Sequence, residues 1–250
     1  MPSPTDPCIL DARTGAPQRW PEGSHRADLE HHLSSPHDAA DGGRHPLPSP
    51  QAWRATLGRW GITPHTSVIV TDDQHGGLAA ARCWWMLRAI GHARVEVQPI
   101  DTLERAWTQE ATPLLEGPAY PGSGDWQWPV VDADVVERRR LDPSWRVIDA
   151  RAAERFRGEV EPIDPVAGHI PGAHNLPWLD HLEPARFLDR FQAIRGDVPM
   201  ERVIVHCGSG VTACHSLLQL DRLGLGQPSL YVGSWSEWCR QQRPVGTVSS

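Results

Sequence analysis

Short apolar runs alternate with amphipathic segments along the whole chain. Four of these runs predict buried strands, at residues 8–13, 67–72, 147–151 and 202–207. Four longer segments carry the apolar stripe of a helix, at residues 50–60, 78–90, 184–194 and 213–223. Because strand and helix alternate in both halves, we expect an α/β fold in which mainly parallel sheets are flanked by helices.

The strand pattern occurs twice. The segment Cys8-Ile-Leu-Asp-Ala-Arg13 matches Val147-Ile-Asp-Ala-Arg151, and Ser67-Val-Ile-Val-Thr-Asp72 matches Arg202-Val-Ile-Val-His-Cys207. In each half the two segments are separated by nearly the same length of chain. The sequence therefore has the organisation of a duplicated domain.

A stretch rich in proline and glycine separates the two halves. It runs from Thr108 to Pro129, and its composition is typical of a linker. We therefore predict an N-terminal domain at residues 1–112, a linker at residues 113–129 and a C-terminal domain at residues 130–250.

The candidate chemistry follows the last predicted strand. Cys207 ends that strand and is followed by Gly208-Ser-Gly-Val-Thr212, which leads into the helix predicted at 213–223. Unpaired N–H groups at a helix N-terminus favour negative charge, so a thiol placed there is suited to act as a thiolate nucleophile. Gly208 and Gly210 allow the loop amides to turn inward and bind an anion. The alternative is a buried structural cysteine, since free cysteines are often buried.

Only one half carries this nucleophile. At the position of Cys207 the first half has Asp72, followed by Asp73-Gln-His-Gly-Gly77. A carboxylate cannot act as a soft nucleophile toward sulfur. We therefore expect the N-terminal half to be catalytically silent.

Charge and composition narrow the possible partners. The 250 residues carry a formal net charge of −7, which disfavours nucleic-acid binding, and no apolar run is long enough to cross a membrane. The chain contains no lysine, so an anionic substrate must be held by arginine or by backbone amides. Five cysteines and an N-terminus unlike a signal peptide predict reduced thiols and a cytoplasmic location.

Several of these stretches resemble the rhodanese-type sulfurtransferases that have tandem rhodanese domains. The likeness covers almost the whole chain, and its strongest parts are Val147–Gly158, Gly168-His-Ile-Pro-Gly-Ala173, the loop after Cys207 and Tyr231–Trp238. It implies that only the C-terminal domain is catalytic. The uncharged loop is similar to that of 3-mercaptopyruvate sulfurtransferases, whereas the thiosulfate enzymes of the family carry arginine and lysine after the cysteine.

We expect no cofactor and no metal, and the mechanism that we derive with the help of this resemblance depends on Cys207. Cys207 would take sulfur from 3-mercaptopyruvate, a 2-oxo thiol acid, as a persulfide and pass it to cyanide or to a thiol acceptor such as a thioredoxin. The amides of Gly208, Gly210, Val211 and Thr212 would stabilise charge on the outer sulfur. Arg151 and Arg155 are candidates to hold the substrate carboxylate and ketone, and structural ion pairs are the alternative for both.

A proton relay is also implied by the resemblance. It would join Ser209 to His45 and Glu30 of the first half. The match there is imperfect, because Gly23-Ser-His-Arg-Ala-Asp28 replaces the motif Gly-His-Ile-Pro-Gly-Ala and other histidines lie nearby. A solvated loop histidine is the alternative for His45.

Other functions agree less well with the residues. A cysteine phosphatase needs an arginine six residues after the cysteine, where this chain has Ala213. A zinc site would need paired cysteines that the spacing does not provide. A thiosulfate sulfurtransferase and a non-catalytic persulfide carrier stay open, because both would use the same cysteine loop.

Overall fold

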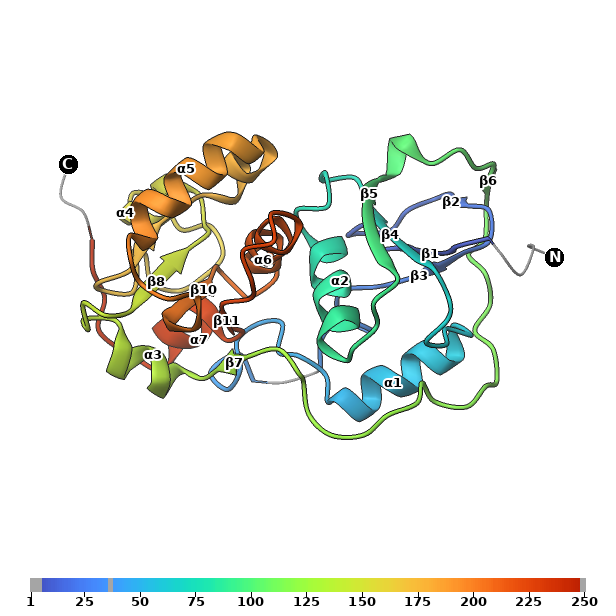
Figure 1. Cartoon of the computed structure of the whole chain (residues 1–250), viewed down its shortest axis with the longest axis horizontal. Helices are drawn as coiled ribbons and strands as arrows, with labels where there is room; N and C mark the ends of the chain where they lie inside the picture. Colours follow the sequence, from blue (N-terminus) through green and yellow to red (C-terminus); the bar gives the residue numbers. More distant parts are fainter. Residues whose placement is uncertain (1–5, 36–37, 248–250) are drawn as a thin grey trace. The chain divides into compact units, whose positions relative to one another are not determined.

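The computed structural model describes residues 6–35 and 38–247 of the chain (Figure 1). Contacts divide the chain into two compact units. The N-terminal unit comprises Met1–Ser35 and Leu47–Trp128, and the C-terminal unit comprises Pro36–Pro46 and Pro129–Ser250. A segment from the first half of the sequence therefore belongs to the C-terminal unit.

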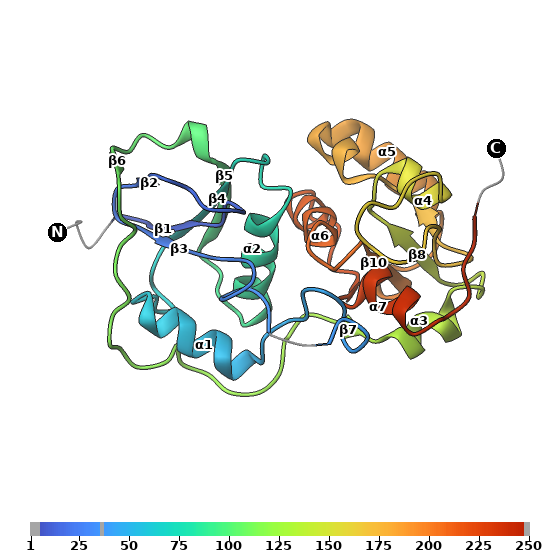
Figure 2. The same cartoon turned by 180° about the vertical axis from the view of Figure 1, so that it is seen from behind.

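The N-terminal unit is built on a parallel sheet with the strand order β3-β1-β4-β5. Its strands are β1 (Cys8–Asp11), β3 (Ser24–Arg26), β4 (Val68–Asp72) and β5 (Val95–Pro99). Helix α2 (Ala79–Ala89) packs on β4 and β5 (Figure 2), and α1 (Pro50–Arg59) buries Trp53 and Leu57. Two short strands, β2 (Trp20–Pro21) and β6 (Trp107–Thr108), form an antiparallel pair, and a 3-10 turn η1 spans Ile100–Thr102.

The C-terminal unit repeats this plan with a five-stranded parallel sheet. Its strand order is β7-β11-β10-β8-β9. The strands are β7 (Val130–Val131), β8 (Arg146–Asp149), β9 (His174–Asn175), β10 (Val203–His206) and β11 (Ser229–Tyr231). All four residues of β10 are buried, because this central strand has neighbours on both edges and is covered on both faces.

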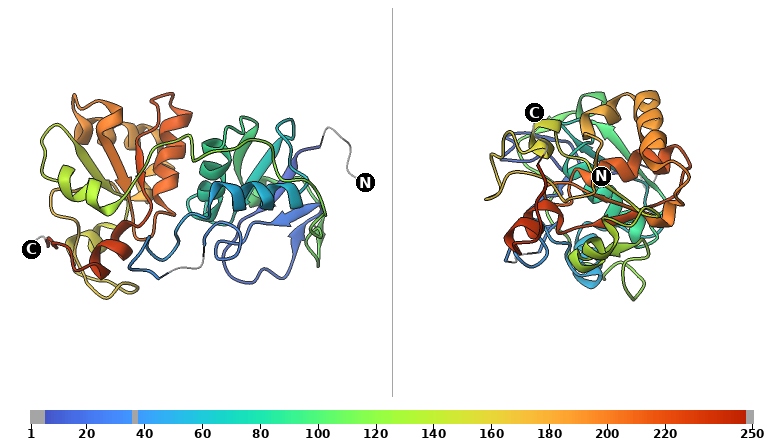
Figure 3. Two further views of the ribbon diagram at one scale, coloured as in Figure 1. Left: turned by 90° about the horizontal axis from the view of Figure 1, so that it is seen from below. Right: turned by 90° about the vertical axis from the view of Figure 1, so that its left-hand side faces the viewer.

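Helices cover the C-terminal sheet. They are α3 (Ala133–Arg139), α4 (Ala153–Arg157), α5 (Pro184–Arg195), α6 (Ala213–Arg222) and α7 (Ser234–Arg240), with 3-10 turns η2 (Trp178–Leu182) and η3 (Met200–Arg202). Helix α6 packs on β10, and α3 packs on β8 and α7 (Figure 3). A buried cluster that includes Ile204, Tyr231, Trp235 and Trp238 joins the sheet to α3 and α7.

The pattern-based predictions of elements are confirmed to within two residues at each end. The four predicted strands correspond to β1, β4, β8 and β10, and the four predicted helices to α1, α2, α5 and α6. Gly91 and Gly224 follow the ends of α2 and α6 with φ of 88° and 67°, the left-handed conformation that glycine adopts without strain.

The division into domains at residues 1–112 and 130–250 stays a prediction, and the compact units differ from it in two places. Most of the proline-rich segment belongs to the N-terminal unit, because Leu115 N–H donates to the carbonyl of Arg59 at 2.7 Å and Gln127 N–H to that of Ala89 at 2.7 Å. The segment Pro36–Pro46 belongs to the C-terminal unit. Neither of the two described ranges contains a helix that is both long enough and apolar enough to cross a membrane.

Candidate active site

Cys207 follows the central strand of the C-terminal sheet. The register pairs His206 with Asp149, so β10 and β8 end side by side and Cys207 lies at the carboxyl edge of the sheet. The start of α7 fixes the cysteine backbone, because the Cys207 N–H donates to Ser234 Oγ at 3.2 Å and the Cys207 carbonyl accepts from Trp235 N–H at 3.0 Å. The carboxyl edge is where α/β proteins bind their ligands.

The loop from Gly208 to Thr212 leads from this cysteine into α6. Gly210 has a φ of 73°, in the left-handed region, which turns the chain back toward the cysteine. Thr212 caps α6 without a side-chain hydrogen bond to the first turn of the helix. The N-terminus of a helix favours an anion, and the five residues from Gly208 to Thr212 separate α6 from Cys207; the role of the loop amides stays a prediction.

Cys207 is buried, with 2% of its surface exposed. Its surroundings nevertheless include charged groups, and it is not part of the hydrocarbon cluster of Trp235 and Trp238. A Cβ added to Gly208, the next residue, would lie 3.3 Å from Arg44 Nη2 and 3.5 Å from Arg155 Nη1. Guanidinium groups therefore lie against the first residue of the loop.

Arg151 is held in buried ion pairs. Its side chain is 1% exposed and donates to the Asp149 carboxylate at 2.7 Å and to the Gly168 carbonyl at 2.7 Å. Burial disfavours the charge of Arg151, but Asp149, Glu161 and the Cys207 sulfur raise the pKa of the guanidinium above its ordinary value. These contacts are the ion pairs considered as the alternative for Arg151, and its role in substrate binding stays a prediction.

Asp149 and His206 lie beneath the loop. Burial works against the charge of Asp149, but Arg151 and His206 hold the pKa of its carboxyl below the usual value. Burial also lowers the pKa of His206, whose ring Nε2 lies 3.9 Å from the Asp149 carboxylate. His206 is therefore neutral near pH 7, and Arg151 is the cation that balances Asp149.

Arg155 is better placed than Arg151 to meet a ligand. It lies on α4 with 17% of its side chain exposed, and its Nε and Nη2 donate to Glu161 at 3.2 and 2.6 Å. The remaining nitrogen, Nη1, is the one that lies near Gly208. The carboxylate of Glu161 thus orients the guanidinium, and its binding of substrate stays a prediction.

The structure brings His45 and Ser209 together within the C-terminal unit. His45 Nδ1 lies 2.8 Å from Ser209 Oγ, although the two residues are far apart in sequence. The position of His45 is set by its neighbours, because Arg44 N–H donates to Ser236 Oγ at 3.0 Å and Gly42 N–H donates to the Glu237 carboxylate at 2.9 Å. A hydroxyl and an imidazole in this contact can exchange a proton.

Glu30 belongs to the N-terminal unit. Its side chain is exposed, and its backbone N–H donates to the Asp28 carboxylate at 2.9 Å in a turn that also binds His31. Its participation in a relay with Ser209 stays a prediction.

Sequence reasoning missed part of this charged site. Four arginines and three buried carboxylates form what we call the arginine cluster, which comprises Arg44, Arg151, Arg155, Arg240, Asp149, Glu161 and Asp164. The cluster contains four guanidinium groups and three carboxylates, so its overall charge is positive. The one local signal for Arg44 was its place directly before His45.

The matching loop of the N-terminal unit is filled by its own side chain. The buried Asp72 carboxylate accepts backbone N–H bonds from Gln74 at 2.9 Å, Gly76 at 2.7 Å, Leu78 at 3.4 Å and Ala80 at 3.2 Å. These are the amides of the loop and of the first turn of α2. The loop binds an anion, but that anion is a fixed carboxylate.

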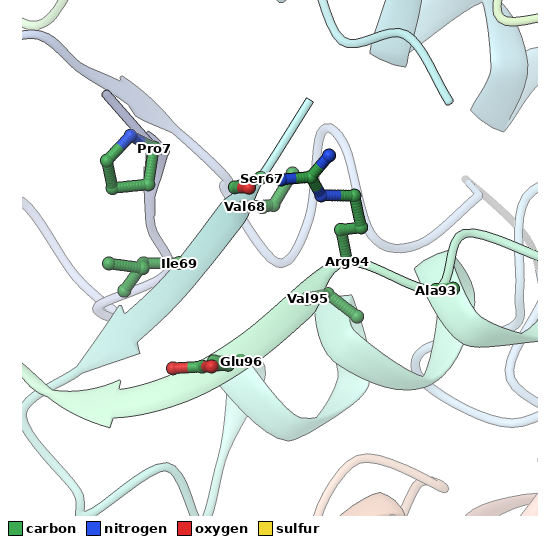
Figure 4. Close-up of a pocket in the computed structure, with 8 residues that line it drawn as sticks. All are labelled: Pro7, Ser67, Val68, Ile69, Ala93, Arg94, Val95 and Glu96. Carbon is green, nitrogen blue, oxygen red and sulfur yellow. The ribbon is translucent and has the colours of Figure 1, made fainter. Parts of the chain in front are cut away.

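A surface hollow of about 450 Å³ in the N-terminal unit lies elsewhere (Figure 4). Its lining includes Ser67, Val68, Arg94 and Glu96, at the amino ends of β4 and β5. Asp72 lies at the opposite end of β4. The hollow is therefore not the counterpart of the cysteine loop.

Comparison with known proteins agrees with this architecture. A family model described as a rhodanese-like domain matches residues 132–241. A protein from Pseudomonas aeruginosa provisionally named a 3-mercaptopyruvate sulfurtransferase is 42% identical over 238 residues, which cover 90% of this chain and 83% of that protein. A Mycobacterium tuberculosis protein provisionally named a thiosulfate sulfurtransferase is 37% identical over 264 residues, covering 95% and 90%.

Solved structures show the same fold. The 3-mercaptopyruvate sulfurtransferase from Leishmania major is similar with a TM-score of 0.75 and 26% identity, over 93% of this chain and 70% of that one. The motifs around Cys207, the paired α/β units and relatives that match nearly end to end lead to one conclusion. The chain belongs to the rhodanese-type sulfurtransferases.

Proposed function

We propose that the protein transfers a sulfane sulfur from 3-mercaptopyruvate, through a persulfide on Cys207, to a thiol acceptor or to cyanide. One observation carries the proposal. The loop after Cys207 has no charged side chain, yet guanidinium groups from outside the loop lie against Gly208. Such a site offers an arginine fork to a carboxylate and backbone amides to the sulfur. The similarity to proteins named 3-mercaptopyruvate sulfurtransferases supports the same substrate.

In the first half-reaction the Cys207 thiolate attacks the sulfur of 3-mercaptopyruvate. A sulfur–sulfur bond forms, the carbon–sulfur bond breaks and its electron pair leaves on carbon as the enolate of pyruvate. A proton then converts the enolate to pyruvate, and the contact between His45 and Ser209 supports a path for it. The amides from Gly208 to Thr212 stabilise negative charge on the outer sulfur of the persulfide.

In the second half-reaction an acceptor attacks the outer sulfur and restores the Cys207 thiolate. Cyanide would leave as thiocyanate, and a protein dithiol of the thioredoxin kind would take the sulfur as a persulfide. Within residues 6–35 and 38–247 the five cysteines form no disulfide, which supports a reducing compartment such as the cytoplasm.

A thiosulfate sulfurtransferase is the second candidate. The relative from Mycobacterium tuberculosis favours it, and so does the positive excess of the arginine cluster, since thiosulfate is a dianion. A non-catalytic persulfide carrier would instead receive its sulfur from a partner protein.

One pair of assays separates these candidates. Pyruvate release from 3-mercaptopyruvate and sulfite release from thiosulfate are measured on the same preparation, with cyanide as acceptor and Cys207→Ser as control. We expect kcat/KM for 3-mercaptopyruvate to exceed that for thiosulfate at least about 10-fold. Equal or faster use of thiosulfate would overturn the choice of donor. Failure to turn over either donor would leave the carrier function in its place.

A further inference from the structure

Arg44 is a charged residue of the site that the sequence analysis did not single out. It precedes His45 in the segment Gly42-Gly-Arg-His45, which lies on α7 in the C-terminal unit. His45 reaches Ser209, and Arg44 reaches Gly208. Two consecutive side chains of one segment therefore meet two consecutive residues of the cysteine loop.

The guanidinium of Arg44 is oriented by a buried acid. Its Nη1 donates to Asp164, whose side chain is fully buried and also accepts from Arg240 Nη1 at 2.7 Å. Its Nη2 is the atom that lies near Gly208. The side chain is 21% exposed, so the group is held in place and still open to a ligand.

Arg155 presents the same arrangement from α4. Glu161 binds its Nε and Nη2, and its Nη1 approaches Gly208. Within residues 6–35 and 38–247, no hydrogen bond uses Arg44 Nη2 or Arg155 Nη1. Two like charges that converge on one point repel each other, and an anion bound between them removes that repulsion.

We propose that Arg44 and Arg155 together bind the carboxylate of the 2-oxo acid, so that Arg44 determines specificity for a carboxylate-bearing sulfur donor. This inference rests on the proposed function. Consecutive Cα atoms are about 3.8 Å apart. A carboxylate held over Gly208 therefore leaves the sulfur of a three-carbon acid within reach of Cys207. The arginine fork that the uncharged loop lacks is supplied by a segment far away in the sequence.

The test compares Arg44→Gln with Arg157→Gln. Arg157 lies on α4 beside the cluster, is 41% exposed and, among residues 6–35 and 38–247, forms an ion pair with Glu159 alone, so it is the matched control for loss of one arginine. We expect Arg44→Gln to raise KM for 3-mercaptopyruvate about 10- to 100-fold with a smaller change in kcat, because one charge-assisted hydrogen bond is lost. Arg157→Gln should stay within about two-fold of the parent.

A donor without a carboxylate distinguishes substrate binding from a structural role. Loading of Cys207 with sulfane sulfur from inorganic polysulfide, measured in a single turnover, should differ less than about three-fold between Arg44→Gln and the parent. An equal loss with both donors would show that Arg44 only holds the loop, and would overturn the inference. Arg44→Lys keeps a cation for Asp164 without the fork, so a raised KM in that variant excludes misfolding as the cause.

Pyruvate binding decides the inference independently of turnover. Ligand-observed NMR titration of pyruvate into Cys207→Ser protein should give a Kd at least about 10-fold weaker when Arg44→Gln is added. An unchanged Kd would overturn the role of Arg44, whatever the donor assays show. Absence of pyruvate release by the parent protein would instead overturn the proposed function, and the titration would still report on Arg44.

Discussion

The loops at the carboxyl ends of β4 and β10 both precede a helix whose N-terminal amides favour a negative charge. The two loops differ in the side chain that lies at this position. In the N-terminal unit the loop amides bind the carboxylate of Asp72, which is part of the chain. In the C-terminal unit the corresponding residue is Cys207, which in the proposed function carries a further sulfur atom. The difference teaches that the anion-binding loop comes with the fold, whereas the chemistry depends on which atom occupies it.

The sharpest way to break this comparison is to give the Cys207 loop the carboxylate that the Asp72 loop has. Cys207→Asp should lower kcat/KM for 3-mercaptopyruvate by at least about 1,000-fold, because a carboxylate forms no persulfide. The protein should stay folded, since an anion at this position is balanced by the arginine cluster. Thermal unfolding and pyruvate release, compared with Cys207→Ser, provide the measurement. Activity within about 10-fold of the parent would mean that Cys207 is not the nucleophile.

The second change removes the carboxylate that the loop of the N-terminal unit binds. Asp72→Ala removes the acceptor of four backbone N–H groups, one of them at 2.7 Å, and should lower the free energy of unfolding by about 3 kcal/mol. The rate of pyruvate release by the folded protein should change less than about two-fold, because the carboxylate is structural. Urea unfolding and steady-state rates test both statements, and Asp73→Ala on the exposed side of the same loop is the control. A large loss of kcat without a loss of stability would contradict a purely structural role for Asp72.

The smallest effect is expected from a change of His206, the residue before Cys207. Its counterpart in the N-terminal unit is Thr71, the residue before Asp72. Burial lowers the pKa of His206 from its usual 6.5, so the folded state binds the proton more weakly than the unfolded chain does. Stability conferred by the neutral ring is complete above about pH 6.5 and falls as the pH decreases from there. His206→Thr should therefore reduce the loss of stability between pH 7 and 5 by about 1 to 2 kcal/mol. Urea midpoints across that range give the measurement, and parallel curves for the two proteins would contradict it.

Local patterns predicted the longest helices and four of the inner strands. The apolar runs of β1, β4, β8 and β10 and the stripes of α1, α2, α5 and α6 are properties of neighbouring residues, so the sequence shows them directly. The family predicted from the motifs is also confirmed. The short helix α4 and the two-residue strands were not predicted, because segments of that length have no periodicity to detect.

The site was predictable only where it is local. Cys207 and its loop form one continuous motif, and the pairing of Arg151 with Asp149 follows from their separation by two residues. Arg44 and Asp164 are 120 positions apart in the sequence, and no local pattern indicates that they form an ion pair. The same reason explains why the proline-rich segment was interpreted as a linker, although its backbone is bonded to α1 and the end of α2.

The segment Pro36–Pro46, which belongs to the C-terminal unit, bears on whether the second half of the chain could work without the first. After a simple duplication, each copy would fold and work by itself. Here the C-terminal unit holds Arg44 and His45, which belong to the first half of the sequence, so a chain that started at residue 130 would lose both. The first half of the chain therefore cannot be removed without also removing two residues that contact the loop of Cys207 or the helix beside it.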